Sequence, residues 1–139
     1  MLEQGAIYRS QGRTVTESDI GIFAGLTGDF TPVHTDAEFA KTTPAGERIA
    51  HGPLVMSTAI GLATPSGLFG ERVIGLVNMN WDFRGPVRIG DTIRSETSVH
   101  EVRPSSKAGR SVATYSFEVF NQHDEIVQTG RIIVVVRSD

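Results

Sequence analysis

An aspartate and a histidine lie five residues apart in the first quarter of the chain, at Asp29 and His34. Pro32 lies between them and fixes one backbone angle of the short connection. A histidine titrates near neutral pH and can accept a proton from water, while a nearby carboxylate can orient that water or carry a proton. The same spacing recurs by chance, so the pair alone also fits a capping aspartate and a surface histidine.

A second segment, His51-Gly52-Pro53, follows seventeen residues after His34. Pro53 suits the start of a helix, where the first backbone N–H groups have no partner within the helix. Gly52 allows close approach of a ligand, and its N–H would stabilise a carbonyl oxygen that gains negative charge. Alone, this segment fits a purely structural helix start equally well. Combined with the Asp–His pair, it suggests an enzyme that moves a proton while a neighbouring oxygen becomes negative.

Helical signals dominate the first half of the chain. Residues 6–15 are mixed and fit an opening strand. Thr16 and Asp19 have the spacing of a helix cap, and Gly28 fits the left-handed residue that ends such a helix. Thr35-Asp36-Ala37-Glu38 reads as a capping box that opens a short helix across Phe39 and Ala40.

Residues 53–63 are nearly all apolar, which predicts a buried helix. From Arg72 onward the apolar residues recur with period two, which predicts strands over 72–83, 91–102, 112–119 and 132–136. Successive strands with short connections form antiparallel sheets. We therefore predict one α+β domain over residues 1–139, in which a curved antiparallel sheet wraps the central buried helix.

Two of the predicted strands carry apolar residues whose neighbours the pattern leaves open. The run Ile132 to Val136 could pair inside the sheet or across a dimer. The strand residues Met79, Trp81 and Phe83 are expected in the core rather than in the lining of a substrate tunnel.

Composition narrows the function classes. A net charge of −3 with scattered basic residues argues against nucleic-acid binding. The chain has no cysteine, which excludes disulfides and Cys-ligated metal sites, and no apolar stretch approaches the roughly 20 residues that span a bilayer. No secretory signal is evident, so a cytoplasmic protein is expected. His34, Asp36 and His51 lack the spacing of helical zinc motifs, and we expect neither a metal nor a cofactor.

The segment FAGLTGDFTPVHTDAEFA, residues 23–40, closely resembles the hydratase signature of MaoC-like (R)-specific enoyl-CoA hydratases and dehydratases. HGPL at 51–54 and PVRIGDT at 86–92 resemble two further segments of that family. The resemblance implies a hotdog fold, a dimer whose sheets join edge to edge, and an acyl-CoA thioester substrate. It thus implies the same architecture as the strand and helix pattern.

The resemblance also implies roles for single residues. Asp29 and His34 match the catalytic acid–base pair, and Gly52 matches the glycine whose N–H binds the thioester carbonyl. The family often places a serine on the central helix to bond the catalytic aspartate, and Ser57 is the candidate here. Ser57 and His51, the residue before Gly52, are the candidates for substrate binding. The chain departs from the family at Thr31, where many members have asparagine.

Together with the resemblance, these residues predict reversible hydration of a trans-2-enoyl-CoA to a 3-hydroxyacyl-CoA, and the resemblance implies the (R) product. Two alternatives stay open. A hotdog thioesterase would use a carboxylate and water to attack C1 of the thioester instead of C3. A non-catalytic acyl-CoA-binding protein would bind the ligand without turnover.

Overall fold

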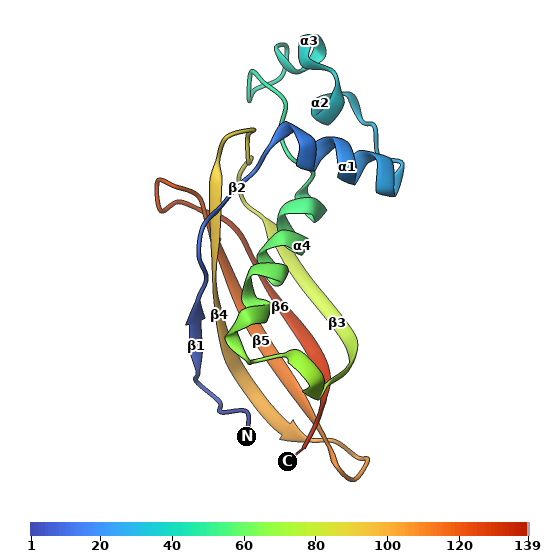
Figure 1. The fold of residues 1–139 in the computed structure, drawn as a ribbon, viewed down its shortest axis with the longest axis vertical. Helices are drawn as coiled ribbons and strands as arrows, with labels where there is room; N and C mark the ends of the chain where they lie inside the picture. The colour runs from blue at the N-terminus through green and yellow to red at the C-terminus, as the bar shows by residue number, and fades with distance from the viewer. Residues whose placement is uncertain (139) are drawn as a thin grey trace.

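An antiparallel sheet of six strands curves around one long helix in the computed structural model, which describes residues 1–138 (Figure 1). The strands are β1 (Ile7–Arg9), β2 (Arg13–Thr14), β3 (Val73–Phe83), β4 (Thr92–Pro104), β5 (Arg110–Phe120) and β6 (Ile126–Arg137). Their order across the sheet is β1-β4-β5-β6-β3, and β2 pairs with a different stretch of β4. The predicted antiparallel hotdog architecture is confirmed; Asp139, the last residue of the predicted domain, lies outside the described residues.

The period-two pattern places one face of each long strand against the core. In β5, Ala113, Tyr115, Phe117 and Val119 are buried, as the alternation predicts. Strand β6 lies between β5 and β3, so the run Ile132 to Val136 pairs inside the sheet. Strand β3 occupies the edge instead.

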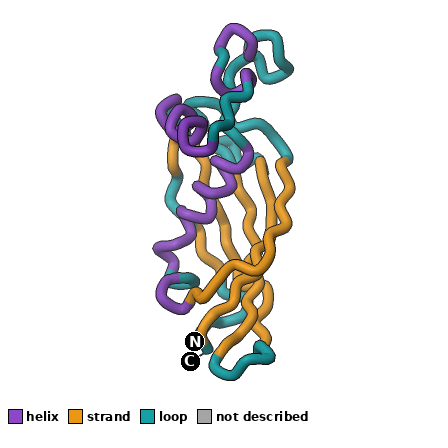
Figure 2. Tube along the Cα trace, turned by 90° about the vertical axis from the view of Figure 1, so that its right-hand side faces the viewer, coloured by secondary structure: helices purple, strands orange, loops and turns teal. Residues whose placement is uncertain are grey.

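Helix α4 (Gly52–Ala63) is the central helix and lies against one face of the sheet, so that helix and strands form two layers side by side in Figure 2. Its buried residues are Leu54, Val55, Ala59 and Ala63, the face that turns toward the strands. The short 3-10 turns η1 (Thr64–Ser66) and η2 (Gly70–Arg72) lead from it into β3. Within residues 1–138, no helix is both long enough and apolar enough to cross a membrane.

Three helices lie beyond one end of the sheet, at the opposite end from the two chain termini (Figure 1). They are α1 (Glu17–Thr27), α2 (Pro32–Thr35) and α3 (Ala37–Ala40). The predicted capping box of Thr16 and Asp19 opens α1, and Gly28 ends it with a φ of 81°. Backbone bonds from Ala50 N to Val87 O (2.7 Å) and from Ile49 N to Val33 O (3.2 Å) tie this region to the rest of the fold.

Local predictions fail at three helix or strand boundaries. The expected strand over 6–15 is two short strands with Gly12 between them. The expected capping box at Thr35 is wrong, because the Asp36 side chain accepts the Phe39 N–H, while the Thr35 hydroxyl donates to carbonyls in its own turn. Aspartate is at least as good a cap as threonine, and Pro32 starts a separate helical turn that ends at Thr35. Helix α4 begins at Gly52 rather than Pro53.

Candidate active site

Asp29 lies in the loop between α1 and α2, where Thr31 holds its carboxylate. The Thr31 hydroxyl donates to Asp29 Oδ1 over 2.5 Å, and the Thr31 backbone N–H donates to the same oxygen over 3.1 Å. These two hydrogen bonds, side chain first, outweigh the opposing effect of desolvation and hold the pKa of Asp29 below its usual value. Asp29 is therefore a carboxylate at neutral pH and acts as a hydrogen-bond acceptor.

His34 lies on the single turn α2 with one ring nitrogen committed and the other available. Its Nδ1 is 2.8 Å from the Ile49 carbonyl oxygen. A carbonyl only accepts, so Nδ1 carries the proton and Nε2 bears a free lone pair. No hydrogen bond to that Nε2 is found within residues 1–138. The ring is thus held in the tautomer that a general base requires.

His51 immediately precedes α4 and is fully buried. Its Nε2 is 3.0 Å from the backbone carbonyl oxygen of Asp29, and its ring stacks on that of His34 with centroids 3.9 Å apart. One ligand-type atom from each of Asp29, His34 and His51 lies within 4.8 Å of the others. The structure therefore brings the Asp–His pair together at the N-terminus of the central helix.

Asp29, His34 and His51 are residue types that bind metals, but their side chains are not arranged around a common point. Asp36, the carboxylate of the trio considered from sequence, caps α3 instead. The His34 and His51 rings are stacked with an interplanar angle of 25°, so their in-plane lone pairs do not converge on one point. Each ring also directs one nitrogen at a backbone carbonyl. These contacts suit proton transfer better than metal binding.

Gly52 begins α4 beside a pocket of about 500 Å³. The pocket is lined by His34, Ile49, Ala50, Gly52, Val55, Phe83, Arg84, Gly85, Pro86, Val87 and Gln128. The Gly52 N–H has no hydrogen-bond partner within the described residues, as expected for the first position of a helix. A Cβ at this position would lie 2.8 Å from the Phe83 ring, so any larger residue requires that ring or the start of α4 to move. His34 and a free helix N–H therefore share one pocket.

Gln128 is a residue of this pocket that the sequence analysis missed. It is buried, its Nε2 donates to the Gly52 carbonyl oxygen over 3.1 Å, and its Oε1 accepts from Trp81 Nε1 over 2.8 Å. An indole N–H only donates, which fixes the orientation of the amide. Trp81 in turn lies against Gly130, where a Cβ would overlap its ring. The sequence does hold one sign of this role: Gln128 is a polar amide directly after the apolar Val127, near the start of a strand.

Two of the three strand residues expected in the core are there. Met79 and Trp81 pack against buried core residues, which confirms the prediction for them. The prediction is wrong for Phe83, which is 54% exposed and lines the pocket beside Gly52. Phe83 is the last residue of β3 and lies beside Gly52, the first residue of α4.

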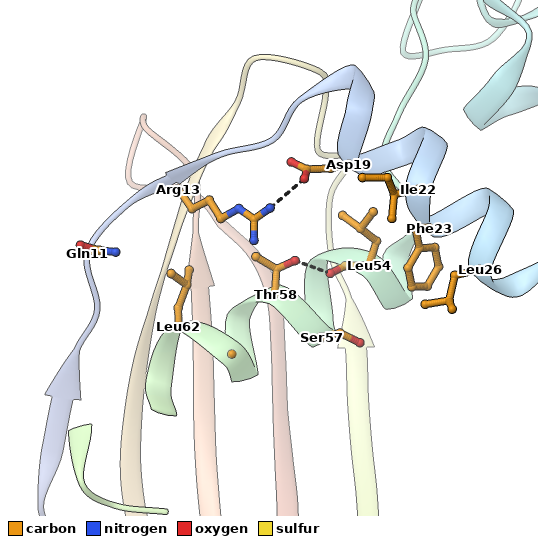
Figure 3. Close-up of a pocket in the computed structure, with 11 residues that line it drawn as sticks. Gln11, Arg13, Asp19, Ile22, Phe23, Leu26, Leu54, Ser57, Thr58 and Leu62 are labelled. Atoms are coloured by element: carbon orange, nitrogen blue, oxygen red, sulfur yellow. Dashed lines mark hydrogen bonds and ion pairs between the residues drawn. The ribbon is translucent and has the colours of Figure 1, made fainter. Parts of the chain in front are cut away.

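Ser57 lies on a different side of α4 from Asp29 and His34, which together are called the dyad below. It is exposed and lines a second pocket, of about 580 Å³, between α1 and α4 (Figure 3). That pocket includes neither His34 nor Gly52, and no hydrogen bond joins Ser57 to Asp29 in the part of the chain described here. One turn later on α4, at the other position where such a serine could lie, the chain has Ile60, which is apolar and packs against the core.

Comparison with known proteins places this geometry in a family. A family model described as a MaoC like domain matches residues 3–119. The chain belongs to the MaoC-like dehydratase family. It is 37% identical over 128 residues to a 3-hydroxybutyryl-CoA dehydratase from Methylorubrum extorquens, covering 89% of this chain and 74% of the relative. It is 40% identical over 101 residues to an (R)-specific enoyl-CoA hydratase from Rhodospirillum rubrum, covering 70% of this chain and 67% of the relative.

A solved structure of another hydratase is also similar to this chain. The R-hydratase PhaJ1 from Pseudomonas aeruginosa superposes with a TM-score of 0.83 at 32% identity, covering 99% of this chain and 84% of that one. Hydratase and dehydratase name the two directions of one reaction class. The MaoC-like chain is therefore a hydro-lyase with a hotdog fold.

Proposed function

We propose that this protein catalyses the reversible hydration of a trans-2-enoyl-CoA to an (R)-3-hydroxyacyl-CoA, without a metal or cofactor. The observation that carries the proposal is the pairing of a free imidazole nitrogen on His34 with a free N–H on Gly52 in one pocket. Asp29, held as a carboxylate, lies within reach of the same imidazole. The name of the Rhodospirillum rubrum relative supports the substrate class and the (R) product.

The reaction needs a base, an oriented water and a site for negative charge. His34 Nε2 takes a proton from a water that Asp29 orients by accepting its other hydrogen. The water oxygen bonds to C3, and the C2–C3 π electrons move through C2 and C1 onto the thioester oxygen. The Gly52 N–H, at the positive end of α4, stabilises the resulting enolate oxygen.

His34 then gives up the proton that it took from the water, this proton is delivered to C2 with the help of Asp29, and the enolate collapses back to the thioester. The net change adds one hydroxyl group to C3 and one hydrogen to C2, so the water supplies every atom and no further reactant is needed. The C–S bond to coenzyme A stays intact throughout. This last point separates the proposal from a thioesterase.

An assay with purified protein and crotonyl-CoA tests the proposal. Hydration removes the enoyl absorbance without releasing free thiol, and chiral analysis of the product should give the (R) isomer. Thiol release in step with substrate loss would favour the thioesterase. Saturable binding of acyl-CoA with no change in absorbance would favour a non-catalytic binding protein.

We also propose that the protein forms a homodimer through β3. This strand is the edge of the sheet next to β6, and an unpaired edge offers backbone donors and acceptors to a second strand. Apolar side chains along it are exposed, with Leu76 at 58% and Val77 at 61%. Light scattering that gives a monomer mass at micromolar concentration would contradict the dimer. Absence of nucleic-acid and membrane partners, and a cytoplasmic location, stay predictions from the sequence.

A further inference from the structure

The buried His51 contacts every part of the proposed catalytic arrangement. It is the residue before Gly52, it bonds the backbone carbonyl of Asp29, and its ring stacks on His34. Phe23 of α1 closes the far side, with ring centroids 4.9 Å apart. The side chain is fully buried and does not line the pocket that His34 and Gly52 share. It therefore reaches the substrate only through its neighbours.

The hydrogen bonds of His51 show that packing alone does not explain a histidine here. Its Nε2 must carry the proton, because the Asp29 carbonyl only accepts. Its Nδ1 is then a buried acceptor, and this atom has no partner within residues 1–138. A buried polar atom without a partner is unfavourable, and a phenylalanine would fill the same space without one. What the histidine adds is the single N–H bond that ties the Asp29 loop to the start of α4.

The stacked rings add a second contribution. When His34 accepts a proton, positive charge develops on a ring whose centroid is 3.9 Å from that of His51. The face of a neutral aromatic ring carries negative potential and favours a cation above it. The stack also fixes the plane of the His34 imidazole relative to the buried His51 ring, because the two rings lie only 25° from parallel.

We propose that His51 is a positioning residue that aligns Asp29 and His34 with the Gly52 N–H. The Nε2–H bond sets the place of the Asp29 loop, and the ring stack sets the plane of the His34 imidazole. This inference rests on the proposed hydratase function. From its place before Gly52, His51 was expected to contact the substrate directly. We propose instead that it acts through Asp29 and His34.

Two substitutions separate the two contributions. His51→Phe keeps a ring for stacking but removes the N–H donor, and His51→Gln keeps a side-chain N–H but removes the ring. We expect each to lower kcat by about tenfold to a hundredfold, since misplacement of a catalytic group by about 1 Å costs rates of that order. KM should change by less than about threefold, because His51 does not contact the pocket.

Two matched controls separate positioning from loss of stability. His100→Gln alters an exposed histidine on β4 and should leave both constants unchanged. Tyr115→Phe removes a buried hydroxyl that donates to the Leu68 carbonyl, far from the dyad. It should lower the thermal midpoint but not kcat. Folded His51 variants with wild-type kcat, or with a loss confined to KM, would overturn the positioning role while the hydratase proposal stands.

A measurement on the wild-type protein gives a readout that needs neither activity nor the variants. The chain has 4 histidines, so their ring nitrogens can be resolved and assigned by ¹⁵N NMR. We expect His51 protonated at Nε2 and His34 protonated at Nδ1. His51 in the opposite tautomer would overturn the proposal even if its variants do not fold. A wild-type protein with these tautomers but no hydration would instead refute the proposed function.

Discussion

Helix α4 has a pocket on each of two sides, and the two pockets are similar in size but not in chemistry. The pocket at its N-terminus measures about 500 Å³, and the pocket between α4 and α1 measures about 580 Å³. In the pocket next to α1, the two charged side chains bond each other, and one threonine hydroxyl bonds the helix backbone. Arg13 Nη2 donates to Asp19 Oδ1 over 2.7 Å, and the Thr58 hydroxyl donates to the Leu54 carbonyl over 2.8 Å (Figure 3).

The pocket at the N-terminus keeps its reactive groups free. His34 Nε2 and the Gly52 N–H have no partners within residues 1–138, while the groups behind them are bonded. Gln128 holds the Gly52 carbonyl, and Ile49 holds His34 Nδ1. Fixed groups with one free donor or acceptor can stabilise a transition state without reorganising. The two pockets thus differ in the kind of polar group left free: an imidazole nitrogen and a helix N–H at the N-terminus, but no free charged side chain among the residues beside α1.

The largest expected effect comes from the dyad. Asp29→Asn and His34→Ala should each lower kcat for enoyl-CoA hydration by about 10²–10⁴, the range for removing a general acid or base. Ser57→Ala, in the pocket beside α1, is the matched control and should stay within about twofold of wild type. Steady-state kinetics measures all three. Near-normal hydration by either dyad variant, or a Ser57 effect as large as theirs, would remove the distinction between the two pockets.

A methyl group at Gly52 should have the next largest effect. Gly52→Ala places a Cβ about 2.8 Å from the Phe83 ring, which must move or displace the start of α4. Since one oxyanion donor is worth about 10²–10³ in rate, we expect kcat to fall by about 10².

The double variant Gly52→Ala, Phe83→Ala sharpens this prediction. It removes the ring that the methyl group meets, so part of the lost kcat should return. If the double variant is no better than Gly52→Ala, the steric explanation is wrong, and the glycine is needed for another reason. Gly61→Ala is the control on the opposite pocket, where a Cβ meets nothing within 4 Å.

Gln128 should have a smaller effect on the rate and a measurable effect on stability. Gln128→Met keeps the volume but leaves the Trp81 N–H and the Gly52 carbonyl without their partner. We expect kcat to fall by about tenfold, and the free energy of unfolding to fall by about 1–3 kcal/mol, the cost of a buried polar group without a partner. Urea unfolding and steady-state kinetics give the two numbers. Trp81→Phe removes only one of the two bonds and should lie between Gln128→Met and wild type.

The catalytic side could be predicted from sequence only where the signal is local. Asp29, His34 and Gly52 lie in short segments whose prolines and glycines indicate a constrained backbone, and the structure brings all three to one end of α4. The period-two strands and the apolar helix were likewise readable, because each depends on neighbours in sequence. The fold therefore followed from repeated local patterns.

Long-range contacts were not readable in the same way. The bond from Gln128 to Gly52 spans 76 residues, and it depends on the register that sets β6 beside β3. Phe83 was assigned to the core because nothing local shows that the end of β3 lies beside the start of α4. Ser57 was linked to the dyad because the family often has a serine on this helix, but its position on α4 places it in the pocket beside α1. Each of these positions is set by packing between elements.

Two aspartates are each bonded by a nearby threonine, but in different ways. Asp19 Oδ2 accepts the Thr16 N–H while the Thr16 hydroxyl accepts the Asp19 N–H, whereas Asp29 Oδ1 accepts both the N–H and the hydroxyl of Thr31. Partial burial pushes the pKa of Asp19 upward, but hydrogen bonds with Thr16 and the charge of Arg13 outweigh it and leave that pKa lowered. The Thr31 hydroxyl and N–H lower the pKa of Asp29. Thr16→Val and Thr31→Val should therefore both raise the pKa of the adjacent aspartate toward 3.8, measured by ¹³C NMR of the carboxyl groups.

The two variants should differ in what else they change. A lowered pKa in the folded state means that the Thr31–Asp29 bonds stabilise the protein above the unfolded pKa and are lost as pH falls through the folded value. The stability difference between wild type and Thr31→Val should thus be present at pH 7 and shrink below pH 3.8. Thr16→Val should show the same pH trend, with an added loss of about 1 kcal/mol from the helix cap. Only Thr31→Val should lower kcat, by a few-fold, because in the proposed mechanism Asp29, and not Asp19, orients the reacting water. An equal loss of kcat in Thr16→Val would mean that the α1 side of the helix contributes to catalysis after all.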